Sequence, residues 1–178
     1  MSKTLQKTLY LIGFMGSGKS TISRHLSQML EVPKIEMDDL LAERAGKPIT
    51  RIFAEDGEEV FRQMETELLR EISAGEPVLV SCGGGVVLRP ENVEIMKSTG
   101  TILMLSATPE TIYGRVRYSN KRPILNGNMN VAFIAELMAK RDPAYRAAAD
   151  VTVSIDGKTS DVVAKELADR IFSNNGSL

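Results

Sequence analysis

The chain has 178 residues, of which 43% are hydrophobic and 25% are charged, and its formal net charge at pH 7 is −1. These values are ordinary for a globular protein and predict one domain over residues 1–178. A net charge so close to zero gives no global field that would attract nucleic acid or an anionic membrane surface, and we expect neither as a partner.

Cysteine content and hydropathy indicate the cellular compartment in which the protein works. Cys82 is the single cysteine, so an intramolecular disulfide is excluded, which fits a reducing compartment. No apolar stretch approaches the length of a membrane span. We therefore expect a cytoplasmic protein, and we expect it to be a monomer.

The first predicted elements are a strand and a helix joined by a glycine-rich loop. Residues 8–12 form an apolar, β-favouring run, and residues 21–30 carry apolar side chains at helical spacing. Between them stands Gly13-Phe14-Met15-Gly16-Ser17-Gly18-Lys19-Ser20, which fits the P-loop pattern G-x-x-x-x-G-K-[ST]. A strand, a glycine loop and a helix in this order are the context that the motif requires.

The residue types of this loop suit a nucleotide phosphate. The glycines admit backbone angles that other residues avoid, so that N–H groups converge on phosphate oxygens, and the following helix N-terminus favours an anion. Lys19 brings a positive charge to the outer phosphates, and the Ser20 hydroxyl can ligate Mg²⁺. The alternative is a glycine-rich turn that binds nothing. The nucleotide-binding residues predicted on this segment are Gly16, Ser17, Gly18, Lys19, Ser20 and Thr21.

Two acids follow in the next elements, a short strand at residues 34–37 and a helix that Gly46 stops near residue 45. Glu36 and Asp38 stand two residues apart at the end of this strand, so we expect their side chains to point the same way. One acid could support the Mg²⁺ shell and the other could orient a substrate hydroxyl. The alternative is that Asp38 caps the following helix.

Helices are predicted next at residues 49–54 and 58–73, the second with a continuous apolar face. Arg62 lies on this second helix. Its alternative interpretation is an exposed arginine paired with Glu58, one turn earlier.

A continuous apolar run at residues 77–82 predicts a buried parallel strand, and Gly83-Gly84-Gly85 follows it. Three glycines would bring backbone N–H groups against a ligand with no side chains in between, whereas the alternative is an unusually flexible turn.

Strands and helices continue to alternate toward the C-terminus. Strands are predicted at residues 101–105 and 151–155, and helices at about 109–117, 130–140 and 160–172. The fold class is therefore α/β, with five parallel strands covered by helices on both faces, and ligands of such sheets bind beyond the carboxyl ends of the strands.

The polar segment at about 118–130 predicts a mobile lid over bound nucleotide. Four arginines lie in or near this segment. Arg115, Arg122 and Arg141 are candidates for binding a ligand, while Arg117 is interpreted as a solvated charge. Closure of the lid could bring Arg122 to a transferring phosphate, and Arg141 is expected to end a helix.

The ordered motifs resemble those of shikimate kinases over about residues 9–172. The residues that carry this resemblance lie in the P-loop and in five later motifs, which are Asp38, Gly57-Glu58-x-x-Phe61-Arg62, Gly83-Gly84-Gly85, Arg122-Pro123 and Arg141-x-Pro143-x-Tyr145.

The resemblance implies a P-loop kinase fold with a substrate-binding region at about 38–73. It implies transfer of the γ-phosphate of ATP to the 3-hydroxyl of shikimate, with Mg²⁺. On the acceptor side, Arg62 and Arg141 would grip the shikimate carboxylate. Asp38 would hold the hydroxyls and accept the proton, and Gly84 and Gly85 would add backbone contacts.

On the nucleotide side, the resemblance implies that Lys19 and Arg122 stabilise the transferring phosphoryl group. Ser20 would hold Mg²⁺, and Arg115 would lie near the adenine. The family usually has Asp-x-Asp where this chain has Glu36-Met37-Asp38, so the first acid is one methylene longer. Our hypothesis is that Glu36 retains the metal role.

Two other functions remain open at this point. One is another small-molecule P-loop kinase, acting on gluconate or a nucleoside monophosphate, against which the paired arginines and the triple glycine argue. The other is a non-catalytic nucleotide-binding homologue, which only the altered acid at Glu36 supports.

Overall fold

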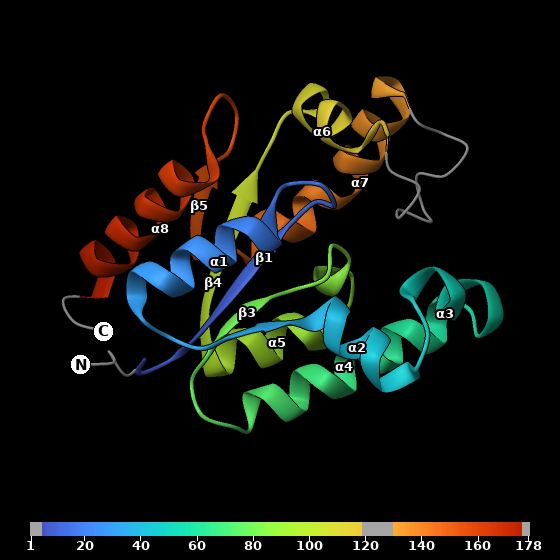
Figure 1. Cartoon of the computed structure of the whole chain (residues 1–178), viewed down its shortest axis with the longest axis horizontal. Coiled ribbons are helices and arrows are strands. Elements are labelled where there is room, and N and C mark those ends of the chain that lie inside the picture. The colour runs from blue at the N-terminus through green and yellow to red at the C-terminus, as the bar shows by residue number, and fades with distance from the viewer. Residues whose placement is uncertain (1–4, 119–129, 176–178) are drawn as a thin grey trace.

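A computed structural model describes residues 5–118 and 130–175 (Figure 1). Most of the predicted lid, including Arg122, lies outside these ranges. Within them, no helix is both long enough and apolar enough to cross a membrane.

The centre of the fold is a five-stranded sheet, as predicted. Its strands are all parallel and lie in the order β2-β3-β1-β4-β5. Their bounds are β1 Thr8–Gly13, β2 Lys34–Glu36, β3 Leu79–Ser81, β4 Gly100–Ser106 and β5 Val151–Ser154. Because β1 lies between β3 and β4, the loop that follows β1 emerges in the middle of the carboxyl edge of the sheet.

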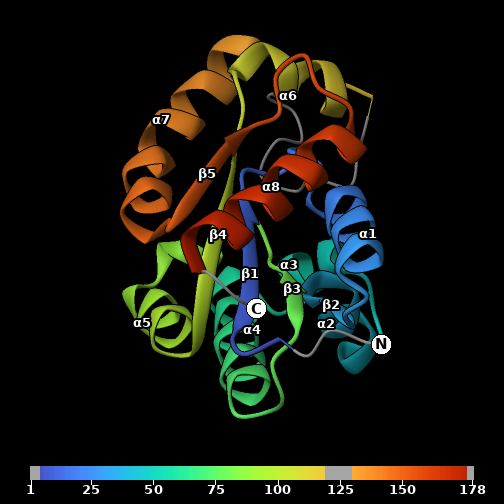
Figure 2. The same cartoon turned by 90° about the vertical axis from the view of Figure 1, so that its left-hand side faces the viewer.

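Helices cover both faces of this sheet (Figures 1 and 2). The helices are α1 Lys19–Leu30, α2 Met37–Ala45, α3 Ile49–Glu55, α4 Glu58–Ser73, α5 Pro90–Thr99, α6 Pro109–Val116, α7 Val131–Ala148 and α8 Ser160–Asn175, and a 3₁₀ turn spans Val86–Leu88. Helices α1 and α8 lie on one face of the sheet, and α4, α5 and α7 lie on the other.

Alternation along β1 divides the core into two clusters. Leu9 and Leu11 belong to the cluster under α1 and α8, whereas Tyr10 and Ile12 belong to the cluster under α4, α5 and α7. All four are at most 2% exposed. Because both faces of the strand are covered, it is apolar at every one of these positions, as expected for a parallel sheet.

The structure corrects the sequence predictions at two helices. Helix α5 was not predicted, because few of its residues face the core: Asn92 and Met96 are the buried ones. Helix α7 does not end beside Arg141 but continues through Pro143 to Ala148. A proline weakens a helix interior by about 3 kcal/mol. Burial of Tyr145 and Ala148 beyond it offsets that penalty.

Candidate functional site

A cavity of about 570 Å³ lies at the carboxyl ends of β1, β2 and β3. The predicted site residues that line it are Gly16, Gly18, Lys19, Ser20, Thr21, Glu36, Asp38, Arg62, Gly84, Gly85, Arg115 and Arg141. They come from six separate segments of the chain. The structure thus brings together around one cavity every predicted site residue in the described ranges except Ser17, which is buried inside the loop.

The P-loop backbone takes the conformation that its glycines permit. Gly16 and Gly18 have φ angles of +80° and +88°, in the left-handed region. A Cβ atom on Gly16 would overlap the Val116 side chain, and one on Gly18 would lie 2.6 Å from Arg115 Nη1. Gly16 is thus required by its backbone angle and by the close approach of Val116 of α6, and Gly18 is required by its backbone angle.

Two cations lie along this loop. Lys19 Nζ donates hydrogen bonds to the carbonyl oxygens of Gly13 at 2.8 Å and Phe14 at 3.2 Å. Arg115 Nη1 donates to the carbonyl oxygen of Ser17 at 3.2 Å. Both positive charges are therefore held at the loop whose N–H groups and helix terminus already favour an anion.

The acid at the end of β2 is held by hydroxyl groups and a lysine. Glu36 Oε2 accepts from Ser20 Oγ at 3.0 Å, and Oε1 accepts from Ser23 Oγ and from Lys34 Nζ, both at 2.8 Å. Burial alone would raise the pKa of Glu36, but the hydrogen bonds from Lys34, Ser23 and Ser81 outweigh it and lower the pKa. Glu36 is accordingly a carboxylate at neutral pH.

The expectation that Glu36 and Asp38 share one strand is wrong. Strand β2 ends at Glu36, which is also the residue before helix α2, and Asp38 lies in the first turn of that helix. The N-cap residue of α2 is Glu36, so Asp38 is not at the capping position that the alternative interpretation gave it. Both acids still line the same cavity because the strand and the helix meet there.

Arg62 is buried in the cavity wall, with 7% of its surface exposed. Its guanidinium donates to Glu65 at 3.1 Å and to Glu58 at 3.3 Å, and it lies 5.4 Å from the ring centroid of Phe61. The alternative of an exposed surface pair is therefore half right: the pairing with Glu58 exists, but Arg62 is not exposed. A Cβ atom on Gly85 would overlap this guanidinium, so the absence of a side chain there makes room for Arg62.

Glu65 is a site residue that the sequence analysis missed. It is fully buried and lines the cavity, and burial raises its pKa to about 7 despite the nearby charge of Arg62. Its Oε2 atom has no hydrogen-bond partner within the described ranges. The signal was available, because Arg62 and Glu65 stand three residues apart on α4 and so share a helix face.

Glu65 and Asp38 approach the same point of the triple-glycine loop. A Cβ atom on Gly83 would lie 2.6 Å from Glu65 Oε2 and 2.9 Å from Asp38 Oδ1. The nearby charge of Asp38 also raises the pKa of Glu65. The absence of a side chain at Gly83 thus lets two carboxyl groups from different helices face one region of the cavity.

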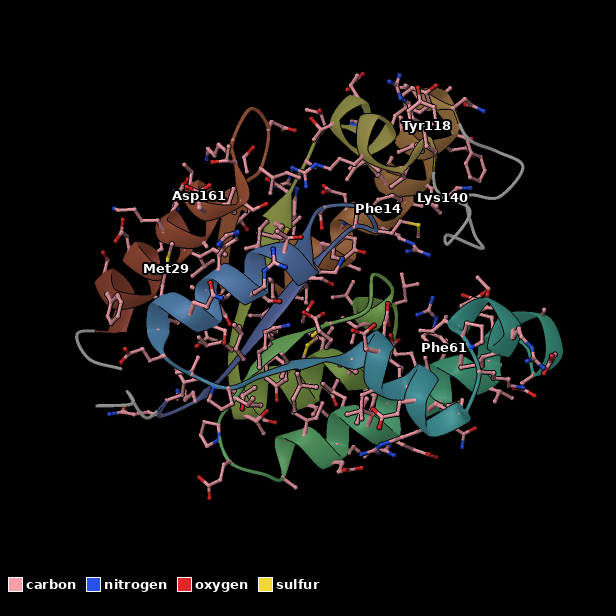
Figure 3. The ribbon with its side chains drawn as sticks, in the orientation of Figure 1. Phe14, Met29, Phe61, Tyr118, Lys140 and Asp161 are labelled. Atoms are coloured by element: carbon pink, nitrogen blue, oxygen red, sulfur yellow. The ribbon has the colours of Figure 1, made fainter. Side chains whose placement is uncertain are left out.

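Arg141 completes the opposite wall. It is 6% exposed and lies 5.8 Å from the ring centroid of Phe14, and its Nη1 atom has no hydrogen-bond partner among the residues described. Tyr145, one turn later, donates a hydrogen bond to the carbonyl oxygen of Gly84. Figure 3 labels the aromatic neighbours of the two arginines, which are Phe14 in the P-loop beside Arg141 and Phe61 on α4 beside Arg62.

Burial raises the pKa of the Tyr145 phenol to about 12, and the positive charges of Arg141 and Arg62 act against this shift. Tyr145 therefore stays protonated as a donor, and both guanidinium groups are close enough to influence it. Arg117, in contrast, is exposed and stacks 4.7 Å from the Tyr118 ring centroid, which confirms its interpretation as a solvated charge.

Comparison with known proteins finds one family that matches nearly the whole chain. The family model described as shikimate kinase matches residues 15–172. A shikimate kinase of Dehalococcoides mccartyi is 38% identical over 166 residues, which cover 93% of this chain and 94% of that protein. A shikimate kinase of Desulforudis audaxviator is 41% identical over 174 residues, with coverages of 96% and 92%.

A solved structure is also similar over nearly the whole chain. Shikimate kinase from Acinetobacter baumannii, in complex with shikimate, superimposes with a TM-score of 0.91 at 30% identity and covers 95% of this chain and 94% of its own. The P-loop, the buried arginines and the extent of these matches lead to one assignment: the chain belongs to the shikimate kinase family.

Proposed function

We propose that the protein transfers the γ-phosphate of ATP to the 3-hydroxyl of shikimate, giving shikimate 3-phosphate and ADP, as a step of aromatic amino-acid biosynthesis. The observation that carries this proposal is that buried Arg62 and Arg141 line the same cavity as the P-loop. A buried cation without a full set of partners is unfavourable, and an anionic acceptor would supply the missing one. A monomer in the cytoplasm stays a prediction.

Arg62, Arg141 and Asp38 form the acceptor end of the cavity. The two guanidinium groups would bind the shikimate carboxylate, because a planar fork of donors matches a carboxylate. Asp38 would hold the hydroxyls and accept the proton of the reacting one. Gly84 and Gly85 would contact the substrate through their backbone, and Glu65 would hold the Arg62 guanidinium in place.

The P-loop forms the nucleotide end. Its backbone N–H groups would hold the phosphates, and Lys19 would exchange its carbonyl partners at Gly13 and Phe14 for phosphate oxygens. Arg115 would lie beside the adenine. Arg122, outside the described residues, is expected to neutralise charge on the transferring group. Such positioning and neutralisation are most of what phosphoryl transfer asks of a protein.

Ser20 and Glu36 are the groups that would hold Mg²⁺. The donors fit this ion, because it prefers hard oxygen ligands and is bound by one or two protein groups together with substrate phosphates. The lowered pKa of Glu36 keeps it anionic. When bound, Mg²⁺ neutralises charge on the phosphate oxygens.

The test is a coupled assay of ADP release with ATP and Mg²⁺ over a panel of shikimate, gluconate and nucleoside monophosphates. We expect shikimate to be the one acceptor of this panel that gives turnover. Lys19→Met should lower kcat by at least about a hundredfold. Turnover with another acceptor would assign a different kinase. Tight ATP binding with no turnover on any acceptor would indicate a non-catalytic homologue.

A further inference from the structure

A lysine accompanies the acid of the nucleotide cavity. Lys34 and Glu36 stand two residues apart on β2, so their side chains share one side of the strand. Ser20 and Ser23, three residues apart on α1, share a helix face that meets this side. The outcome is a four-membered cluster of one lysine, one glutamate and two hydroxyl groups.

Both oxygens of Glu36 are occupied in this cluster. Oε1 is 2.8 Å from Lys34 Nζ and accepts from Ser23, and Oε2 accepts the proton of Ser20. The Glu36 side chain is 16% exposed and that of Lys34 is 29% exposed, so water screens the pair only partly. Glu36 lines the cavity. Its negative charge is thus balanced by a fixed cation of the chain itself.

The hydroxyl of Ser20 links this ion pair to the nucleotide. By donating its proton to Glu36, Ser20 leaves its lone pairs available for a cation on the other side. A divalent cation at Ser20 would be attracted by Glu36 and repelled by Lys34 Nζ, which is bound to the same carboxylate. The net attraction is smaller than an unpaired glutamate would give.

We propose that Lys34 is a resident counter-cation of Glu36 that sets the divalent-cation requirement of the nucleotide site. With Lys34 in place, the metal competes for the charge of a carboxylate that is already neutralised, so more Mg²⁺ is needed for the same occupancy. This inference rests on the proposed function, because it takes the P-loop as a nucleotide-binding site. The opposing interpretation is that Lys34 only anchors Glu36, in which case its removal would weaken metal binding.

Calorimetric titration of ADP over a series of Mg²⁺ concentrations tests the proposal without turnover. The variants are Lys34→Met, which keeps length and removes charge, Lys34→Arg as the matched control, and both Glu36→Gln and Lys34→Met/Glu36→Gln. We expect Lys34→Met to lower the Mg²⁺ concentration for half-maximal enhancement of ADP binding about three- to tenfold. Lys34→Arg should stay within about twofold of the unaltered protein. Lys34→Met should have a smaller effect when Glu36 is glutamine, because the ion pair that holds Lys34 beside the site is then already lost.

ADP titrations with a chelator present separate a metal effect from damage to the site, and there Lys34→Met should bind ADP as the unaltered protein does. An unchanged or higher Mg²⁺ requirement in Lys34→Met would overturn the proposal. So would a change in ADP affinity that is equally large with the chelator present. If ADP binds the unaltered protein but Mg²⁺ does not alter its affinity, this inference fails while nucleotide binding stands. If ADP does not bind at all, the proposed function fails with it.

Discussion

At the scale of single residues, the part of the cavity wall formed by α4 and α7 contains charges that are buried before any ligand arrives. Arg62, Glu65 and Arg141 are each at most 7% exposed. Arg62 and Glu65 neutralise one another in part, but Glu65 Oε2 and Arg141 Nη1 have no hydrogen-bond partner within the described ranges. Buried polar atoms left in this state are unfavourable for stability and point to a site that a ligand completes.

The first prediction concerns Arg62. Arg62→Ala should raise the KM for shikimate by about 30- to 1,000-fold, because a fork to a desolvated carboxylate contributes about 2–4 kcal/mol. The KM for ATP should change far less. Steady-state kinetics with each substrate varied in turn measure both. Arg44→Ala is the control, since Arg44 forms an exposed pair with Glu71. Equal effects on the two KM values would contradict the placement of Arg62.

Glu65 gives a prediction about pH. Its pKa is about 7 in the folded protein against an ordinary value of 4.5, so the folded state binds the proton more tightly than the unfolded chain. Stability should therefore fall as the pH rises from about 4.5 to about 7, by up to about 3 kcal/mol, when Glu65 loses its proton in a buried site.

Glu65→Gln removes this titration. Urea unfolding at pH 5 and pH 8 should show the variant gaining stability relative to the unaltered protein at the higher pH. Glu71→Gln, at an exposed position, is the control. A stability difference between variant and unaltered protein that is the same at both pH values would refute the assignment.

At the scale of elements, the triple-glycine loop is the point where α4 and α7 meet the sheet. A Cβ atom on Gly85 would overlap the Arg62 guanidinium from α4, and the Gly84 carbonyl accepts a hydrogen bond from Tyr145 of α7. Asn92 of α5 adds a hydrogen bond to the carbonyl oxygen of Val86 at 2.9 Å, just after the loop. The glycines are therefore held by contacts, which argues against a flexible turn.

Gly85→Ala should accordingly displace Arg62. We expect the KM for shikimate to rise about tenfold or more and the free energy of unfolding to fall by about 1–3 kcal/mol, because the added methyl group has no room. Gly114→Ala is the matched control, since nothing lies within 4 Å of an added Cβ there. That substitution should leave the KM unchanged and should slightly stabilise α6. An unaltered KM in Gly85→Ala would argue against the close approach of Arg62.

At the scale of the whole molecule, the sheet separates the site from much of the core. The cluster under α1 and α8 includes Leu103, which is fully buried, whereas Arg62 and Arg141 lie on α4 and α7, on the other face of the sheet. Stability and substrate binding should therefore respond separately to changes in this cluster.

Leu103→Ala tests this separation. Loss of the buried side chain should lower the free energy of unfolding by about 2–5 kcal/mol, measured by urea titration, while the KM values of the folded enzyme stay within a few-fold. Val162→Ala, at a position 48% exposed on α8, should change stability by no more than about 0.5 kcal/mol. A large rise in the KM for shikimate would show that the two faces are coupled.

The sequence by itself determined the sheet and the P-loop, because both depend on local patterns. Apolar runs followed by glycine loops predict parallel strands, and the spacing from Gly13 to Ser20 predicts the phosphate site. Residue order also indicated Arg62 and Arg141 as members of one site, although only through resemblance to a family.

Only the tertiary structure decided which residues meet. The raised pKa of Glu65 could not be predicted, because the burial that causes it comes from elements remote in the sequence. The continuation of α7 past Pro143 likewise depends on packing that outweighs a local preference. The same holds for Glu36, whose pairing with Ser20 and Ser23 arises where β2 lies beside α1. Local sequence specifies the elements, but long-range contacts set the environment of each charge.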